Sequence, residues 1–462
     1  MPFLYLSAAH KSSGKTTVTL GLCRALHRRG LKVQAYKKGP DYIDPIWHTQ
    51  ASRQPCYNLD FNLMRQREIV DLHARHLAHA DIGLIEGNKG LYDGMDLLCG
   101  NSNAALAKLL GAPVVLILDT IGMTRGIAPL LLGYQAFDPE VNIAGVILNK
   151  VGGPRHEAKL REVVAHYTRI PVLGAIHKND KLAIVERHLG LIPGNEVGEA
   201  EAQIDTIADI ITAQVDIDAL LAVAATAPAT AHAYPVEASL SSGLRVGVAM
   251  DRAFGFYYNE DLDSLRQAGV ELVPIDTLRQ TALPAIDALI VGGGFPEAYI
   301  SELTANAPLR ADIRHKIDAG LPVYAECGGL MYLSRSIRWN DTFGTMVGIV
   351  PGDCVMGARP VGRGYASLRQ IAPGPLGMAK AEVIQAHEFH YSHLENLAPD
   401  IAFAYAVERG HGMDGAHDGY IYKNLLASYC HRRGSGEHGW ITPFIDLARK
   451  HAKARQTSRL AA

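Results

Sequence analysis

A short strand that runs into a glycine-lysine-threonine turn and then into a helix constrains this chain more than any other feature. The apolar run Phe3 to Ala8 reads as a buried strand, and Thr16 to Arg29 has the amphipathic pattern of a helix. Between them lies Ser-Ala-Ala-His-Lys-Ser-Ser-Gly-Lys-Thr-Thr at 7–17. This order of elements is typical of a phosphate-binding loop and favours a parallel α/β sheet.

Such a loop assigns a role to each residue of its core. Backbone N–H groups at the helix start hold phosphate oxygens, Lys15 reaches between the β- and γ-phosphates, and the Thr16 hydroxyl binds Mg²⁺. Gly14, Lys15, Thr16 and Thr17 are therefore predicted to bind a nucleotide. Ala9 stands where the usual pattern has its first glycine.

Carboxylates near the ends of the following strands fit the same site. Asp41 and Asp44 lie in a turn-rich loop, and Glu86 ends the strand Ile82 to Glu86. Carboxylates at this edge of a sheet can hold Mg²⁺ or position an attacking group, and for Glu86 we expect the metal or its waters. Asp41, Asp44 and Asp93 have capping of turns as an alternative role.

The length and texture of the chain predict its domains. With 462 residues it is too long for one ordinary core. Residues 1–200 alternate strands with helix-length segments, which predicts a parallel sheet with helices on both faces. Residues 201–243 are predicted to be an acidic, alanine-rich connecting helix and a flexible linker. A second alternating series predicts another α/β domain over 244–446, and 447–462 reads as a basic tail that continues a terminal helix.

A further strand of the first domain ends at Asn149, which would read the adenine edge or cap a loop.

The composition indicates small-molecule partners. The net charge is −2 with scattered Lys and Arg, which speaks against a nucleic-acid surface. There is no apolar run of about 18 residues, so no membrane span is expected. The start has no signal-peptide pattern, and the six cysteines are widely spaced, so we expect a cytoplasmic protein without a disulfide framework or zinc site.

A second motif in the C-terminal half indicates a nucleophile. The run Val323 to Met331 reads as a strand, a sharp turn that carries Cys327, and a helix start, which exposes a thiol and favours the thiolate. Upstream, a strand ends in three glycines at 292–294, whose backbone can donate to an oxyanion. The predicted oxyanion residues are Gly293, Gly294 and Gly328.

The nucleophile needs a base, and three histidines are candidates. His431 follows the strand-like run Tyr420 to Leu426 and is the preferred base. His387 and His390 are competitors that could instead bind substrate or satisfy hydrogen bonds in the core.

Taken together, these motifs resemble the cobyrinic acid a,c-diamide synthase family over nearly the whole chain. The motifs are Ser-Gly-Lys-Thr-Thr at 13–17, Lys-Gly-Pro-Asp-Tyr-Ile-Asp-Pro at 38–45 followed by His48, Asn-Leu-Asp at 58–60, Glu-Gly-Asn-Lys-Gly-Leu-Tyr-Asp-Gly at 86–94, Glu-Arg-His-Leu-Gly-Leu at 186–191, Asp-Arg-Ala-Phe-Gly-Phe-Tyr-Tyr at 251–258 and Glu-Cys-Gly-Gly-Leu-Met-Tyr-Leu at 326–333.

The resemblance implies a dethiobiotin-synthetase-like ATP domain fused to a class I glutamine amidotransferase domain, with Cys327 as nucleophile and His431 as its partner. ATP would phosphorylate a carboxylate of a tetrapyrrole such as cobyrinate or hydrogenobyrinate, and ammonia from glutamine would displace the phosphate. Lys15, Thr16 and Glu86 would serve ATP and Mg²⁺. The residues expected near the acceptor are Asp41, Tyr42, Asp44 and Asp93. The resemblance leaves the oligomeric state undetermined, with a homodimer as one possibility.

Two departures keep the acceptor open. The loop carries Ala9 and His10-Lys11, and the segment 432–436 lacks the His-Phe usual in cobyrinate enzymes. Both are similar to the siroamide synthase branch, which amidates sirohaem. No Glu stands two residues beyond His431, so the carboxylate of the triad is also open. Cobyric acid synthase and a partitioning-type ATPase are weaker alternatives, the latter because it would lack the cysteine elbow.

Overall fold

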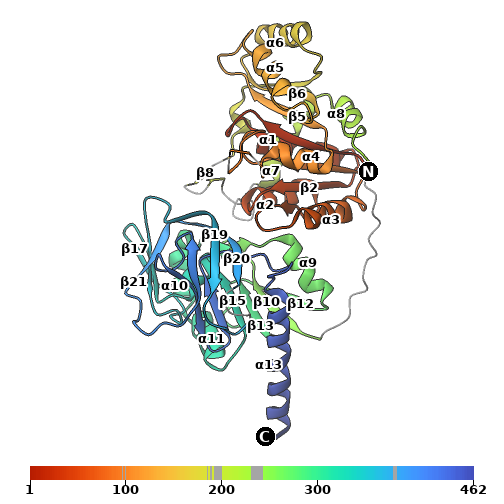
Figure 1. Ribbon diagram of the computed structural model, residues 1–462. Coiled ribbons are helices and arrows are strands. Elements are labelled where there is room, and N and C mark those ends of the chain that lie inside the picture. Colours follow the sequence, from red (N-terminus) through yellow and green to blue (C-terminus); the bar gives the residue numbers. More distant parts are fainter. Residues whose placement is uncertain are drawn as a thin grey trace. The chain divides into compact units, whose positions relative to one another are not determined.

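The computed structural model describes residues 1–95, 97–98, 100–184, 186–187, 190–191, 200–229, 243–377 and 382–461. They form two compact units, Met1–Pro235 and Val236–Ala462 (Figure 1). Cys99, residues 188 and 189 of the motif at 186–191, and residues 230–242 of the predicted linker lie outside the described residues. The expected α/β class holds for both units.

The first unit is built on a parallel sheet of seven strands, in the order β3-β2-β4-β1-β5-β6-β7. The runs Phe3 to Ala8 and Ile82 to Glu86 form strands with the predicted bounds, because apolar residues are needed on both faces of a covered sheet. The strands are β1 (Phe3–Ala8), β2 (Val33–Lys38), β3 (Tyr57–Leu59), β4 (Ile82–Glu86), β5 (Val114–Asp119), β6 (Ile143–Val151) and β7 (Val172–His177).

Helices cover both faces of this sheet (Figure 1). One core packs beneath α3 (Gln66–Leu77), α4 (Asn103–Leu110), α5 (Ile127–Phe137) and α6 (Pro154–Tyr167). The other packs beneath α1 (Lys15–Arg28), α2 (Ile43–Ser52), α7 (Ala200–Gln214) and α8 (Ile217–Ala224). Side chains at the carboxyl ends of the parallel strands therefore meet at one edge of the sheet.

The segment after residue 200, predicted as a connecting helix, is helical in the structure. This segment forms two helices, α7 and α8, that pack onto the first unit. Ile204, Ile207 and Ile211 are fully buried in the core shared with α1. Their spacing of three and four residues makes one apolar stripe, and burying that stripe stabilises the helix against the sheet layer.

The second unit has a sheet of nine strands, in the order β12-β10-β13-β15-β24-β23-β22-β19-β20. The first five are parallel, and the rest are antiparallel. The strands are β10 (Arg245–Ala249), β12 (Glu271–Ile275), β13 (Ala288–Val291), β15 (Val323–Glu326), β19 (Gly362–Gln370), β20 (Val383–His390), β22 (Phe403–Arg409), β23 (His417–Tyr422) and β24 (Leu425–Ser428).

Smaller elements complete this unit. The helices are α9 (Asn259–Gln267), α10 (Ile300–Ala305), α11 (Ala307–Asp318), α12 (Gly328–Leu333) and α13 (Ile441–Ala461). Strands β11 (Phe254–Phe256) and β14 (Gly293–Gly294) form a two-stranded sheet. A four-stranded sheet contains β16 (Ser336–Trp339), β17 (Thr342–Thr345), β18 (Asp353–Met356) and β21 (Ser392–Glu395).

The run Tyr420 to Leu426, predicted as one strand, is two strands joined by a tight turn. Lys423 adopts a positive φ of 52° in this turn, which lets β23 reverse into β24. The reversal makes β24 parallel to β15, so that the residues after β24 and after β15 lie at the same sheet edge.

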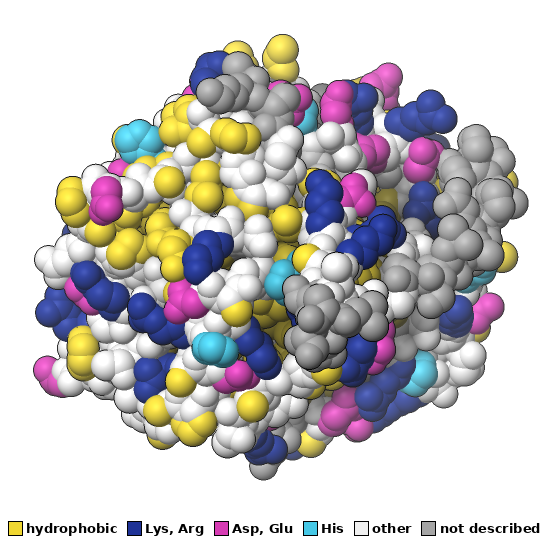
Figure 2. Space-filling view, turned by 90° about the horizontal axis from the view of Figure 1, so that it is seen from below, with side chains coloured by type: hydrophobic (Ala, Val, Ile, Leu, Met, Phe, Trp, Pro, Cys, Tyr) yellow, Lys and Arg dark blue, Asp and Glu magenta, His cyan; other side chains and the backbone are white. Residues whose placement is uncertain are grey.

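One face of the molecule carries side chains of both charges. On the face drawn in Figure 2, Lys and Arg side chains are interspersed with acidic, hydrophobic and uncharged ones. Within the described residues, no helix combines the length and the apolar character needed to cross a membrane. The basic C-terminal segment continues α13, where Arg455 donates to the carbonyl oxygen of Ile286 at 3.0 Å.

Candidate functional site

The phosphate loop joins β1 to α1 and is shaped by one glycine. Gly14 precedes α1 with a φ of 88°, in the left-handed region. A Cβ there would lie 2.2 Å from the Nδ2 atom of Asn149. That atom donates to the Ser13 carbonyl at 2.8 Å, and the Oδ1 of Asn149 accepts from the Lys150 amide at 2.9 Å. Asn149 thus braces the loop, as the capping alternative anticipated, and its role toward adenine stays a prediction.

The first half of the loop is held without the usual glycine. The hydroxyl of Tyr134, on α5, donates to the Ala9 carbonyl at 2.8 Å. The Ser13 hydroxyl donates to the His10 carbonyl at 2.9 Å. These contacts give a physical account of how the departure at Ala9 is accommodated.

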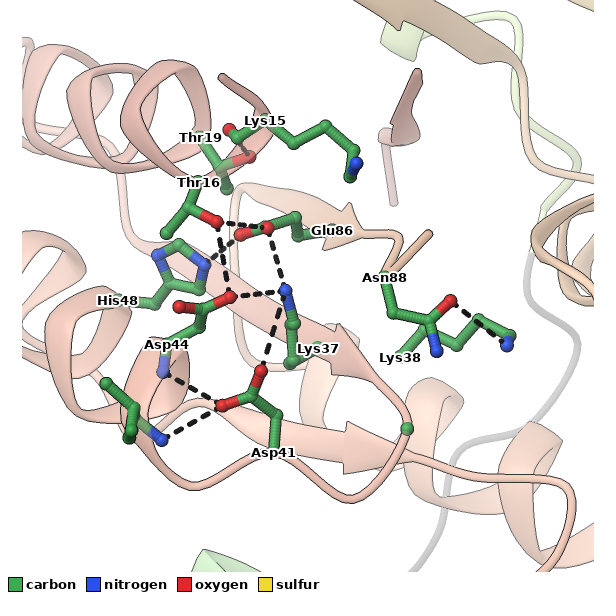
Figure 3. A network of polar contacts seen from close by, with 12 residues as sticks. Lys15, Thr16, Thr19, Lys37, Lys38, Asp41, Asp44, His48, Glu86 and Asn88 are labelled. Atoms are coloured by element: carbon green, nitrogen blue, oxygen red, sulfur yellow. Dashed lines mark hydrogen bonds and ion pairs between the residues drawn. The ribbon is translucent and has the colours of Figure 1, made fainter. Parts of the chain in front are cut away.

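A polar network lies beside the loop at the carboxyl ends of β2 and β4 (Figure 3). The Thr16 hydroxyl donates to Glu86 Oε1 at 2.7 Å and lies 3.2 Å from Asp44 Oδ2. The Lys37 ammonium donates to the same two oxygens, at 2.8 and 2.5 Å. His48 Nε2 contacts the second oxygen of Glu86. The structure therefore brings Thr16, Asp44 and Glu86 together. Lys37 and His48 also belong to this network, although the sequence motifs assigned them no role.

Glu86 is ionised in this network. It is fully buried, and burial alone would raise its pKa, but Lys37 and His48 hold the pKa of Glu86 well below its usual range. A buried carboxylate that stays charged is a suitable ligand for a divalent cation or its waters.

The residues at this edge fit Mg²⁺ of the kind found at phosphate-transfer sites. Across the described part of the chain, no three His, Cys, Asp or Glu side chains form a group that would hold a metal by themselves. Mg²⁺ in such sites takes one or two carboxylates and completes its shell with waters and substrate phosphates. Thr16, Asp44 and Glu86 offer such a partial set.

The other predicted acceptor residues have structural contacts. Asp41 Oδ1 accepts from the amides of Ile43 and Asp44, at 2.9 and 3.1 Å, and so caps the start of α2. Asp93 Oδ2 accepts from the Gly90 amide at 2.9 Å. These are the turn-capping contacts of the alternative interpretation. Tyr42 is buried at the start of α2, and the roles of all three toward an acceptor stay predictions.

Two further lysines are buried in the first unit without an ion pair to any described residue. The Lys15 ammonium lies 3.5 Å from the His10 carbonyl, and the Lys38 ammonium lies 3.4 Å from the Asn88 amide oxygen. Burial lowers the pKa of each lysine to about 8. Carboxylates nearby offset this only in part, namely Glu86, Asp44 and Asp93 for Lys15 and Asp60 for Lys38, so an anion bound at either ammonium group would stabilise its charge.

Cys327 stands on a strained turn in the second unit. Its φ is 49° and its ψ is −106°, a conformation that a non-glycine residue adopts rarely. The turn is feasible because glycines follow it: a Cβ on Gly329 would lie 2.0 Å from the Val291 carbonyl oxygen, and one on Gly328 would lie 2.9 Å from the Gly294 nitrogen. The turn predicted for the elbow is therefore present at the end of β15, but its thiol is buried, with Cys327 only 6% exposed, and the expectation of an exposed thiol was wrong.

The glycines proposed for the oxyanion lie beside this elbow. Gly293 and Gly294 form β14, at the carboxyl end of β13. A Cβ on Gly293 would lie 2.7 Å from the Cε1 atom of His431, and one on Gly294 would lie 2.0 Å from the Ala253 carbonyl. Their backbone is thus close to the Cys327 and His431 pair, and donation to an oxyanion stays a prediction.

Of the three candidate histidines, His431 is the one that hydrogen-bonds Cys327. Burial alone would lower the pKa of His431, but the charge of Cys327 and hydrogen bonds with Cys327 and Glu326 raise it to about 10. Its Nδ1 atom lies 3.3 Å from Glu326 Oε2. At neutral pH this favours the imidazolium form of His431.

The competing histidines have other surroundings. His387 pairs with His431 through the backbone, with N···O distances of 2.9 and 2.7 Å. Burial and the neighbouring His431 lower the pKa of His387 to about 3, so its ring is neutral. His390 lies against the Ser392 carbonyl at 2.8 Å and stacks on Tyr429 with 4.1 Å between ring centres. His390 is thus satisfied within the core.

Comparisons with known proteins find matches for both units of the chain. The family described as CobQ/CobB/MinD/ParA nucleotide binding domain matches residues 8–192, and the family described as CobB/CobQ-like glutamine amidotransferase domain matches residues 245–436. A cobyrinate a,c-diamide synthase of Magnetococcus marinus is 44% identical over 452 residues, 96% of each chain. Proteins of the same name from Methanosarcina barkeri and Dehalococcoides mccartyi are 38% and 40% identical, over 98% and 93% of this chain and 97% and 94% of theirs.

Proposed function

The chain belongs to the cobyrinate a,c-diamide synthase family, and from this premise we propose that it amidates the a and c carboxylates of cobyrinate or hydrogenobyrinate. It is a glutamine-hydrolysing carbon–nitrogen ligase that uses ATP. The observation that carries the proposal is the presence, in one chain, of a phosphate loop facing the ionised carboxylate of Glu86 and of a cysteine elbow with its histidine. Use of ATP and glutamine also supports a cytoplasmic location.

In the first unit, we propose transfer of the γ-phosphoryl group of ATP to the acceptor carboxylate. The carboxylate oxygen attacks the phosphorus, ADP leaves, and an acyl phosphate forms. Lys15 and Lys37 would neutralise charge on the transferred group, and the α1 N-terminus would hold the phosphates. Thr16 and Glu86, with Asp44 beside them, would hold Mg²⁺, which supplies charge neutralisation when bound.

In the second unit, we propose that the Cys327 thiolate attacks the side-chain amide carbon of glutamine. The developing oxyanion would be held by backbone N–H groups of Gly293, Gly294 and Gly328. The His431 imidazolium donates its proton to the leaving ammonia, which gives a glutamyl thioester. His431 then takes a proton from water, and hydrolysis of the thioester releases glutamate.

Ammonia completes the reaction by attacking the acyl phosphate and displacing inorganic phosphate, so that each carboxylate becomes an amide. Free ammonium at high concentration would replace glutamine as the nitrogen source. Two such cycles give the a,c-diamide.

A second candidate acceptor is sirohaem or sirohydrochlorin. It is favoured by the departures at Ala9 to Lys11 and at 432–436, which are similar to the siroamide branch. Cobyric acid synthase chemistry is less supported, because the relatives described above carry the a,c-diamide name.

Mass spectrometry of the products tests the proposal. The enzyme is offered cobyrinate, hydrogenobyrinate, sirohydrochlorin and sirohaem in separate reactions with ATP and glutamine. Two carboxyl-to-amide exchanges on a corrinoid, and no more, are expected. Exchange only on sirohydrochlorin or sirohaem would move the assignment to the second candidate. Four exchanges, or none on any tetrapyrrole, would refute the proposed function.

A further inference from the structure

The residue that precedes the nucleophile carries a buried carboxylate with an unusual set of contacts. Glu326, the last residue of β15, is only 8% exposed. Its Oε1 atom accepts from the Tyr324 hydroxyl at 2.5 Å and from the Arg432 amide at 2.8 Å. Its Oε2 atom lies 3.3 Å from His431 Nδ1. Both oxygens are therefore fixed, and one faces the histidine of the site.

We propose that Glu326 is the carboxylate that positions His431 and completes the Cys327–His431 pair. The proposal rests on the glutaminase role proposed above for that pair. Glu326 acts through His431 and is a positioning residue. It occupies a place in the chain different from that of the usual triad carboxylate, since Arg433 stands two residues beyond His431.

The fold explains why this residue can reach the histidine. Strands β15 and β24 are parallel, with Glu326 opposite Ser428, so His431 emerges at the same sheet edge three residues later. Strand alternation places Tyr324 and Glu326 on one face. Tyr324 stacks on Trp440 with 3.9 Å between ring centres, which fixes the hydroxyl that donates to the carboxylate.

The contact determines which nitrogen of His431 carries which proton. A carboxylate at Nδ1 keeps a proton on that atom and leaves Nε2 for the thiol. It also stabilises the imidazolium, in agreement with the raised pKa of His431. Without this carboxylate the ring could rotate or adopt the other tautomer, and both changes remove the nitrogen that serves Cys327.

The other buried carboxylates in this region are held elsewhere. Glu388 accepts from the amides of His411 and Gly412, at 2.6 and 3.0 Å, and lies 3.4 Å from His390. Asp418 accepts from the amides of Tyr429 and Cys430 and from the Ser428 hydroxyl. Further titratable groups that act electrostatically on or with Glu326 are Tyr257, Asp261, Tyr405 and Arg432.

The test is Glu326→Gln in the full-length enzyme, with Tyr324→Phe as the matched control. Glutamine keeps the shape but loses the charge, so we expect kcat for glutamine hydrolysis to fall at least about tenfold, with KM changed much less. Ammonium-supported amidation should persist. Tyr324→Phe removes a hydrogen bond from the same carboxylate without touching His431 and should cost less than about threefold.

A second readout separates positioning from a structural role. Alkylation of Cys327 by iodoacetamide, followed on its peptide by mass spectrometry, reports the thiolate that the imidazolium stabilises. In Glu326→Gln this alkylation should be slower at neutral pH and recover at higher pH. Glu326→Asp keeps the charge and should show an intermediate rate, and it replaces the Gln variant if that variant fails to fold.

The outcomes separate the two proposals. A wild-type enzyme that does not hydrolyse glutamine would overturn the proposed function itself. Wild-type hydrolysis together with a Glu326→Gln variant of unchanged kcat and unchanged alkylation profile would overturn the role of Glu326 alone. Equal losses in Glu326→Gln and Tyr324→Phe would also overturn it, because the effect would then belong to the local packing.

Discussion

The two units hold their buried cations differently. In the second unit, the His431 imidazolium lies between Cys327 and Glu326. In the first unit, Lys15 and Lys38 are buried with no ion pair to described residues. The consequence appears in the pKa values. The pKa of His431 is raised to about 10 despite burial, and burial lowers the pKa of each lysine to about 8. The amidotransferase site thus holds its cation against a carboxylate of the chain, whereas these two lysines have no carboxylate within ion-pair distance among the described residues, and an anionic ligand would stabilise their charge.

This difference suggests how each half works. A site that holds its imidazolium between a cysteine and a carboxylate of the same chain is assembled before substrate binds, so glutamine hydrolysis should depend on a few residues that act as a unit. A lysine ammonium group that has no ion pair among the described residues gains one when phosphate binds, so these lysines should matter when ATP is used. The predictions below separate these two dependences.

The largest effect is expected from Cys327→Ser. It should abolish glutamine-supported amidation and leave amidation with high ammonium, because only the nitrogen from glutamine passes through the thiol. Product formation is measured with each nitrogen donor. Cys354→Ser, a buried cysteine of the same unit, is the control and should keep both activities. Loss with both donors in a folded Cys327→Ser protein would break the separation of the two sites.

Lys15→Ala should lower amidation by about 10²- to 10³-fold with either nitrogen donor, because the ammonium neutralises charge that develops during phosphoryl transfer. Glutamine hydrolysis should persist or become uncoupled from amidation. Lys11→Ala removes an exposed lysine from the same loop and should have little effect. Normal ammonium-dependent turnover in Lys15→Ala would contradict the assignment of the phosphate loop.

His431→Ala should cost about a hundredfold or more in glutamine hydrolysis, since it removes the proton-transfer partner of Cys327. His387→Ala and His390→Ala should cost much less. The rate of glutamate release is the measurement, with ammonium-dependent amidation as the check on the first unit. The opposite ranking would move the base to the segment 387–390.

The sequence predicted those parts of the molecule that depend on local pattern. Apolar runs predicted β1 and β4 with their bounds, and the glycines after Cys327 predicted the strained elbow, because only glycine tolerates the close backbone approach there. The pattern after residue 200 predicted a helix, and the structure has helices there, but an apolar stripe does not show which unit covers the helix.

Contacts between distant segments could not be predicted in the same way. Lys37 and His48 meet Glu86 only once β2, α2 and β4 are placed side by side. Glu326 precedes the nucleophile in the motif, but its contact with His431 spans 105 positions and depends on the turn at Lys423 that sets β24 parallel to β15. The only sequence signal that Glu326 serves His431 was the absence of a Glu two residues beyond His431.

The smallest effect is a fractional proton uptake when ATP binds. With a pKa of about 8, Lys15 is partly deprotonated near pH 8 in the protein without ligand. Phosphate next to its ammonium favours the charged form and raises that pKa, so binding should take up protons. Uptake should be negligible near pH 6.5, where the lysine is already protonated, and should grow between pH 7 and 9.

Calorimetry in buffers of different ionisation enthalpy measures this uptake. Lys38→Met is the matched control, because Lys38 is buried and has the same lowered pKa but lies at Asn88 rather than in the phosphate loop. It should leave the uptake unchanged, while Lys15→Met should remove the larger part. If the wild type shows no uptake at any pH, or if Lys38→Met removes it, then Lys15 is not the unbalanced charge that the nucleotide neutralises, and the contrast between the two sites must rest on other groups.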